Sequence, residues 1–269
     1  MTRTASLGMY DMPWLHSAND ALWTGIAARL RAAGLSGVPE TLDRDRPLGE
    51  IWRDPALRLA QTCGYPLMTQ LADIVAPVAA PVYRWPGCSG AAHCSVVVVA
   101  VGSHYEALGD LRGGRAAMNG RDSNSGMNLL RHAVAPLATD GRFFGAVVET
   151  GSHLASLDHV AWGQADVAAV DCVTFGLARR HRPDLTAGVR VLAETAKSPS
   201  LPFVTRASAS AEEIALLRRA LAEAIADPEL AAATEALGLA GVEPVTAEDY
   251  EIVLAYERQA EAAGYPALA

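Results

Sequence analysis

A short loop rich in hydroxyl and amide side chains is the part of the chain best suited to chemistry. Ser123, Asn124, Ser125 and Gly126 lead into residues 127–137, where apolar residues recur at helical spacing. The first N–H groups of a helix have no partner within the helix, and they form an anion site together with nearby hydroxyl donors. A glycine there allows a ligand to approach the backbone. The loop therefore predicts an oxyanion site, or alternatively no more than a serine cap of the helix.

Polar residues also occupy other predicted turns between a strand and a helix. Tyr10, Tyr65, His153 and Asp171 each lie at or just after the expected end of a strand. In open α/β sheets, ligands bind at the carboxyl ends of strands, so we expect these side chains to share one ligand cleft with the serine loop. Taken singly, His153 is compatible with an ordinary surface or core histidine. Asp171, taken singly, is more typical of a helix cap.

A hydrolytic triad is a competing interpretation of the same residues. Ser125, His153 and Asp171 are a nucleophile, a base and an orienting acid. The chain lacks the G-x-S-x-G turn of a nucleophile elbow, and it also lacks the glycine-rich phosphate motifs of nucleotide enzymes. We therefore expect a binding protein without catalytic residues and without a cofactor.

Composition and charge exclude several other classes of function. The chain has 269 residues, of which 51% are hydrophobic, and a formal net charge of −8. This charge argues against a nucleic-acid partner, although a small anion in a cleft is recognised by local donors. Cys88 and Cys94 could close a small loop if oxidised. Together with His93 they lack the second ligand pair of a typical zinc site, so no metal is expected.

Two features of the sequence concern membranes and export. The longest apolar run, around residues 95–101, is too short to span a bilayer, so no membrane insertion is expected. The first residues lead almost directly into a strand-like segment without the pattern of a signal peptide. The sequence therefore leaves a cytoplasmic location and the prior removal of a signal as alternatives.

Hydrophobic patterns predict an alternation of strands and helices, and hence mainly parallel sheets flanked by helices. Residues 74–82 contain two prolines, which favours an edge strand or an extended connection. The valine-rich residues 95–101 favour a strand covered on both faces. A capping box at Ser210 predicts a helix, and the last quarter of the chain reads as almost wholly helical. Strands are expected at residues 5–9, 57–61, 95–101, 115–118, 144–148, 166–170 and 189–193.

A set of short motifs, in this order, resembles the phosphate, phosphite and phosphonate substrate-binding proteins of ABC transporters. The motifs are Gln61–Pro66, His93–Ser95, Asp110–Gly113, Ser123–Gly126, Gly151–His153 and Asp166–Asp171. The resemblance covers about residues 5–250. It implies the type II periplasmic-binding-protein fold, with two α/β lobes and a ligand cleft between them. It assigns residues 1–95 and 200–269 to the first lobe and 96–199 to the second, with crossovers near residues 94–95 and 195–201.

The resemblance also implies a function and roles for particular residues. It implies capture of a small oxyanion of the phosphonate, phosphite or phosphate type for an ABC-transporter permease. The ligand contacts fall on the serine loop and on His153, with Tyr10 and Tyr65 from the first lobe. Asn124 and His93 depart from the residues common in the family, which leaves the size and charge of the ligand open.

Three further interpretations stay open at this point. One is an enzyme on the same fold that acts on a pyrimidine resembling a thiamin precursor. Another is a ligand sensor in the cytoplasm. The third concerns Asp171, which either caps the following helix or accepts a hydrogen bond from the ammonium of an aminoalkylphosphonate.

Overall fold

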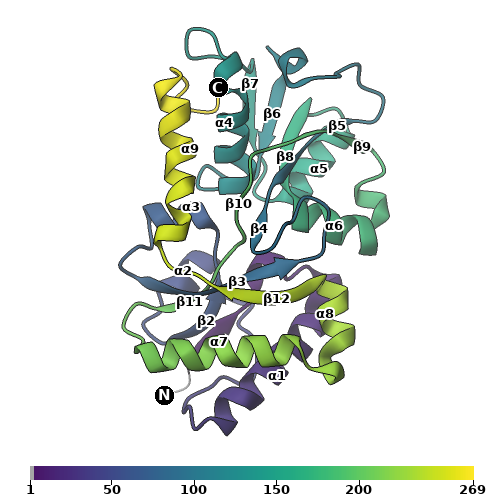
Figure 1. Ribbon diagram of the computed structural model, residues 1–269. Coiled ribbons are helices and arrows are strands. Elements are labelled where there is room, and N and C mark those ends of the chain that lie inside the picture. The colour runs from purple at the N-terminus through teal and green to yellow at the C-terminus, as the bar shows by residue number, and fades with distance from the viewer. Residues whose placement is uncertain (1–2) are drawn as a thin grey trace. The chain divides into compact units, whose positions relative to one another are not determined.

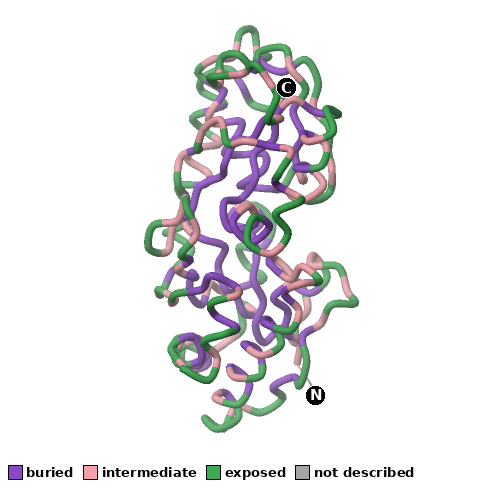
Figure 2. Tube along the Cα trace, turned by 90° about the vertical axis from the view of Figure 1, so that its right-hand side faces the viewer, coloured by how far each residue is buried: buried purple, intermediate pink, exposed green. Residues whose placement is uncertain are grey.

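The computed structural model describes residues 3–269, which form two compact units (Figure 1). Of these residues, 3–84, 89–91 and 199–250 form the first unit, and 85–88, 92–198 and 251–269 form the second. Each unit contains a five-stranded sheet flanked by helices. Buried backbone runs through the interior of both units, and exposed backbone follows the outer helices and loops (Figure 2). The mixed α/β fold expected from the sequence is therefore present in both units.

The sheet of the first unit has the strand order β1-β2-β11-β3-β12. β1 and β2 are parallel, whereas β11 is antiparallel to both of its neighbours and β12 is antiparallel to β3. The strands are β1 (Thr4–Ser6), β2 (Leu57–Gln61), β3 (Val75–Tyr83), β11 (Phe203–Arg206) and β12 (Leu239–Pro244). The helices are α1 (His16–Ala32), α2 (Leu48–Trp52), α3 (Gly64–Thr69), α7 (Ala211–Ile225) and α8 (Ala231–Leu237).

Two expectations about the first unit were wrong. β3 is neither an edge strand nor a connection, because it pairs with β11 on one side and β12 on the other. Its Pro77 lies opposite Val204, where the register shifts, and such an irregularity accommodates a residue that has no N–H to donate. The last quarter of the chain is not wholly helical either, since it contributes β11 and β12. β12 lacks a clear alternating pattern, so its pairing with β3 decides its conformation.

The starts of two helices in this unit contrast with each other. The predicted capping box is present at α7, where Ser210 Oγ accepts a hydrogen bond from the backbone N–H of Glu213 at 3.1 Å. α1 begins at His16, directly after the 3₁₀ turn Pro13–Leu15, and no side chain forms a cap hydrogen bond at its start. The local capping signal at Ser210 was therefore sufficient to predict the start of α7.

The sheet of the second unit has the strand order β7-β6-β8-β5-β9. β6 is parallel to β7 and β8, whereas β5 is antiparallel to β8 and β9. Both sheets are consequently mixed, and the expectation of mainly parallel sheets was wrong in this respect. β5 lies inside the sheet and is buried on both faces, as its run of valines predicted. The strands are β5 (Ser95–Ala100), β6 (Arg115–Met118), β7 (Ala146–Glu149), β8 (Val167–Asp171) and β9 (Val189–Glu194).

Helices cover this second sheet. The predicted helix of residues 127–137 begins as a π-helical turn, Asn124–Asn128, and continues as α4 (Leu129–Val134). The others are α5 (His153–Ala161), α6 (Cys172–His181) and α9 (Glu251–Ala262). α9 runs beside α4 (Figure 1). None of the helices in residues 3–269 is long and apolar enough to cross a membrane.

The C-terminal segment differs from the expected division of the chain. Residues 251–269 belong with the second unit, although the sequence placed them with the first. Ala260 and Tyr265 are fully buried in the apolar core of the second unit. Asn128 Nδ2 donates to the carbonyl of Val253 at 3.0 Å, and Arg131 Nη1 donates to that of Pro266 at 2.7 Å. These contacts depend on residues more than a hundred positions apart, which no local pattern encodes.

The chain changes unit several times near two short strands. β4 (Ala92–His93) and β10 (Ser198–Pro199) pair with each other in a separate two-stranded sheet. The unit changes between Ala91 and Ala92 and again between Ser198 and Pro199. Two candidate residues lie near these short strands. His93 is part of β4, and Asn124 Nδ2 donates to Ser198 Oγ of β10 at 2.9 Å.

Candidate functional site

The candidate residues are divided between the two units. Tyr10 and Tyr65 belong to the first unit. The others belong to the second unit and lie on the serine loop, on β4, at the start of α5 and at the end of β8: His93, Ser123, Asn124, Ser125, Gly126, His153 and Asp171. The second unit thus brings together in one fold most of the side chains that the sequence singled out.

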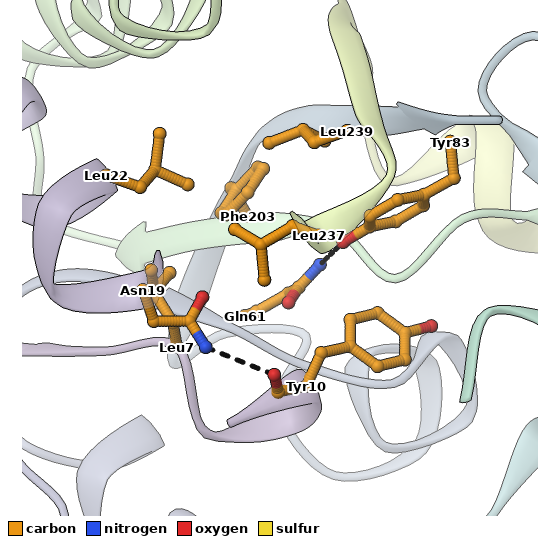
Figure 3. A pocket seen from close by; sticks show the side chains of 9 residues that line it. All are labelled: Leu7, Tyr10, Asn19, Leu22, Gln61, Tyr83, Phe203, Leu237 and Leu239. Atoms are coloured by element: carbon orange, nitrogen blue, oxygen red, sulfur yellow. Dashed lines mark hydrogen bonds between the residues drawn. The ribbon is translucent and has the colours of Figure 1, made fainter. Parts of the chain in front are cut away.

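The two tyrosines of the first unit have different surroundings. Tyr10 ends the 3₁₀ turn Gly8–Tyr10, is 4% exposed, and packs edge to face against Tyr83 with the ring centroids 5.5 Å apart. Figure 3 shows both rings beside Gln61, whose Nε2 donates to Tyr83 Oη at 3.4 Å. Tyr65 lies on α3 and is partly exposed.

A small cavity lies next to Tyr10 and has a volume of about 10 Å³ (Figure 3). Its walls combine leucine side chains with the polar groups of Asn19 and Gln61. This volume corresponds to about one water molecule. The cavity is therefore too small to hold an oxyanion such as phosphate.

The serine loop has the geometry of a helix start. Ser123 Oγ accepts a hydrogen bond from the N–H of Gly126 at 3.0 Å, so the capping alternative holds for Ser123. Asn124 is buried and accepts from Asn128 Nδ2 at 3.1 Å, in addition to its contact with Ser198. The backbone carbonyl of Ser125 accepts from Ser95 Oγ at 2.8 Å. The loop is held rigidly by the second unit's own side chains.

The side chains of Ser125 and His153 lie within hydrogen-bonding distance of each other. Ser125 Oγ lies 2.9 Å from His153 Nε2. His153 is the first residue of α5, whose cap is Ser152, with Oγ accepting from the N–H of Ala155 at 3.1 Å. A serine hydroxyl beside an imidazole can donate to the ring or accept from it, according to which ring nitrogen carries the proton.

Burial lowers the pKa of His153 below its ordinary value of 6.5. His93 acts in the same direction, whereas Asp171 and the carbonyl of Ala169 act against it. The ring is consequently neutral at neutral pH. A bound anion would favour the protonated ring, whose Nε2–H would donate to Ser125 and leave the serine proton for the anion.

His93, the other candidate histidine, pairs with the carboxylate of Asp171. His93 Nε2 lies 3.1 Å from Asp171 Oδ2, and both side chains are almost fully buried. Asp171 Oδ1 accepts from the N–H of Thr174 at 2.8 Å, so Asp171 caps α6, which was the alternative left open by the sequence. Burial alone would raise the pKa of Asp171, but His93, His153 and this N–H lower it below its ordinary value.

The pairing of Asp171 with His93 argues against a hydrolytic triad. A triad requires the acid to hydrogen-bond the ring nitrogen that faces away from the serine. Nδ1 of His153 is buried without an aligned hydrogen bond, and Asp171 is next to His93 instead. Ser125 and His153 therefore lack the orienting acid that a catalytic triad requires.

Gly126 and Asn119 show a contact that sequence reasoning missed. A Cβ atom on Gly126 would lie 1.8 Å from Asn119 Oδ1 and 3.2 Å from His153 Cε1. The space above the glycine is thus filled by the Asn119 side chain. Asn119 directly follows β6, so its place at the end of a strand is the signal that could have identified it.

Arg121 lies on the surface, and the four cysteines are free thiols. Arg121 is 83% exposed and pairs with Glu149 on the surface. Cys88 does not form a disulfide with Cys94, and its Sγ lies 3.6 Å from Cys172 Sγ. A hydrogen bond with Cys172 raises the pKa of Cys94, and burial adds to the effect. A hydrogen bond with Cys88 and burial raise the pKa of Cys172, whereas Cys94 acts against them.

The pKa of His153 predicts how stability depends on pH. The unfolded chain binds a proton at His153 near pH 6.5 and the folded chain only at lower pH, so stability should fall as pH drops below about 6.5. His153→Gln should make this decrease smaller, whereas the exposed His104→Gln should not. Urea unfolding between pH 7.5 and 5 measures the difference. Equal losses of stability in the wild type and in His153→Gln would contradict the prediction.

Comparison with known proteins decides the family. The family described as ABC transporter, phosphonate, periplasmic substrate-binding protein matches residues 57–250. The chain belongs to this family. No curated protein sequence matches the chain.

Solved structures of low sequence identity share the fold of this family member. The binding protein of an ABC phosphonate transporter from Pseudomonas aeruginosa has a TM-score of 0.72 at 16% identity, over 98% of this chain and 87% of that one. A Prochlorococcus marinus protein in complex with methylphosphonate has a TM-score of 0.71 at 13% identity, over 97% and 98%. The aliphatic sulphonate binding protein of Escherichia coli has a TM-score of 0.60 at 18% identity, over 97% and 85%. The similarity supports the two-lobed α/β fold.

Proposed function

We propose that this substrate-binding protein captures a small phosphorus oxyanion of the phosphonate, phosphite or phosphate type for the permease of an ABC transporter. The observation that carries the proposal is the 2.9 Å contact between Ser125 Oγ and His153 Nε2 in the loop that starts the α4 helix. Membership in the phosphonate-binding family and the methylphosphonate complex of a protein with the same fold support it.

The donors of the second unit suit an oxyanion. Ser125 supplies a hydroxyl proton to the anion when the protonated His153 donates its Nε2–H to Ser125 Oγ. Hydrogen bonds to a charged acceptor contribute about 1.5–3 kcal/mol each, which makes two or three such donors sufficient for specific recognition. Tyr10, Tyr65 and His93 stay predictions, as do ligand contacts of Ser123, Asn124, Gly126 and Asp171.

The chemical identity of the ligand is the part of this proposal that needs a direct test. Phosphonates and sulfonates both present a tetrahedral centre with oxygens, and the fold is shared by binders of each. We propose the phosphorus compounds because the family that matches this chain is described by phosphonate.

A thermal-shift panel tests the proposal. The panel contains phosphate, phosphite, methylphosphonate, 2-aminoethylphosphonate, methanesulfonate and a pyrimidine, with acetate as an anion of a different shape. A ligand at 100 times its dissociation constant stabilises a protein by about 2.7 kcal/mol, which is a measurable shift. We expect at least one phosphorus oxyanion to stabilise the protein more than methanesulfonate does. Stabilisation by methanesulfonate alone, or by the pyrimidine alone, would overturn the assignment.

A further inference from the structure

Asn119 has a polar side chain that the second unit leaves without a partner. It directly follows β6 and precedes the serine loop. Its Oδ1 atom is buried, and no hydrogen bond to it is formed within residues 3–269. A buried acceptor without a partner destabilises a fold, so such a group in a native protein calls for an explanation.

The position of Asn119 connects it to Ser125 and His153. Its carbonyl oxygen lies against the Cα atom of Gly126, because a Cβ there would be only 1.8 Å away. The His153 ring reaches the same point, with Cε1 3.2 Å from that Cβ position. Gly126 is the neighbour of Ser125 in the chain. Asn119 and His153 therefore lie over the same glycine, and His153 contacts Ser125 as well.

The geometry of a carboxamide then determines where its donor points. The group is planar, with the oxygen and the nitrogen on opposite branches of one carbon. Since Oδ1 is turned towards Gly126, Nδ2 is turned away from it. Nδ2 is not among the buried unpaired atoms of residues 3–269, and it makes no hydrogen bond within them, so it is accessible and its two protons are available.

We propose that Asn119 is a further ligand-positioning residue, whose Nδ2 donates to one oxygen of the anion while Ser125 donates to another. This inference rests on the proposed function and adds a residue to it. The ligand class that suits two separate donors is an anion with several oxygens on one tetrahedral centre. Directing Nδ2 outwards leaves Oδ1 buried without a partner, which lowers the stability of the ligand-free protein.

Two variants test this role with methylphosphonate as the probe. Asn119→Ala removes the donor and also the unpaired buried oxygen. We expect the affinity to fall about 10- to 100-fold while the stability of the ligand-free protein stays the same or increases. Asn119→Asp keeps the shape but places a carboxylate oxygen where Nδ2 was, so repulsion should weaken binding further than alanine does. A purely structural asparagine would instead show a loss of stability in Asn119→Ala with unchanged affinity.

Calorimetry of both variants, of Ser125→Ala and of the wild type separates the possible outcomes. Circular dichroism first establishes that each variant is folded. If methylphosphonate binds the wild type and Ser125→Ala weakens it, but both Asn119 variants bind normally, the role of Asn119 is wrong and the proposed function stands. If neither methylphosphonate nor any other oxyanion of the panel binds the wild type, both proposals are overturned.

Discussion

Replacement of Ser125 by alanine should weaken binding of the oxyanion by about 10- to 100-fold. Ser125 is 4% exposed and its Oγ lies 2.9 Å from His153 Nε2, so His153 orients the hydroxyl before a ligand arrives. Its loss removes one hydrogen bond to a charged group, which contributes about 1.5–3 kcal/mol. Isothermal titration calorimetry with the best ligand of the panel measures the change.

Ser103→Ala is the matched control for this variant. Ser103 lies in the same unit, beyond the end of β5 opposite to Ser95, and its Oγ accepts from Arg190 at 3.4 Å. The control removes a hydroxyl of the same chemistry far along the sheet, so we expect affinity to stay unchanged. A Ser125→Ala protein that binds the ligand as tightly as Ser103→Ala would remove Ser125 from the site.

Replacement of Glu213 by alanine should cost the first unit about 3–5 kcal/mol of stability. Glu213 on α7 pairs with Arg58 of β2, which is 1% exposed, and with Arg206 of β11. Arg206 Nη1 donates to Oε1 at 2.7 Å. Removal of the carboxylate leaves two largely buried guanidinium groups without their shared anion, and a buried charge without a partner is strongly destabilising.

Glu223→Ala provides the control, since Glu223 lies on the same helix with a side chain that is 55% exposed. Its loss should change stability by no more than about 0.5 kcal/mol. Urea unfolding at pH 7 compares the two variants. Similar unfolding midpoints for both would show that the Glu213 network contributes little.

The Glu213 pair also has a pH dependence. Burial alone would raise the pKa of this carboxyl, but Arg206 and Arg58 lower it below the ordinary value of 4.5. The stabilisation is therefore present above about pH 4.5 and is lost as pH falls towards the lower pKa of the folded state. The effect of Glu213→Ala should accordingly shrink in acid, which distinguishes it from the His153 effect that begins near pH 6.5.

Local sequence patterns were enough to identify several features. The run of valines predicted a buried strand, and β5 is buried on both faces. The capping box at Ser210 predicted the start of α7, and the serine loop predicted the start of the helix that follows it. Each of these features depends on residues within a few positions of one another, where periodicity and capping act directly.

The partners of the candidate residues could not be predicted in this way. Ser125, His153 and Asp171 were proposed together, but His153 contacts Ser125 whereas Asp171 is next to His93. Similarly, Cys88 lies beside Cys172 and not bonded to Cys94. Types of residue in a plausible order do not encode which pairs meet, because each pairing depends on how distant strands and helices are packed.

The sequence by itself thus determined the alternation of strands and helices, the positions of polar turns after strands, and the family. Tertiary structure alone decided the direction of strand pairing, the strand β12, and the docking of α9 in the second unit. It also decided that Asn119 occupies the space over Gly126. The physical reason is that periodicity and capping are local, whereas β12 and α9 derive their place from hydrogen bonds and apolar contacts with residues far away in the chain.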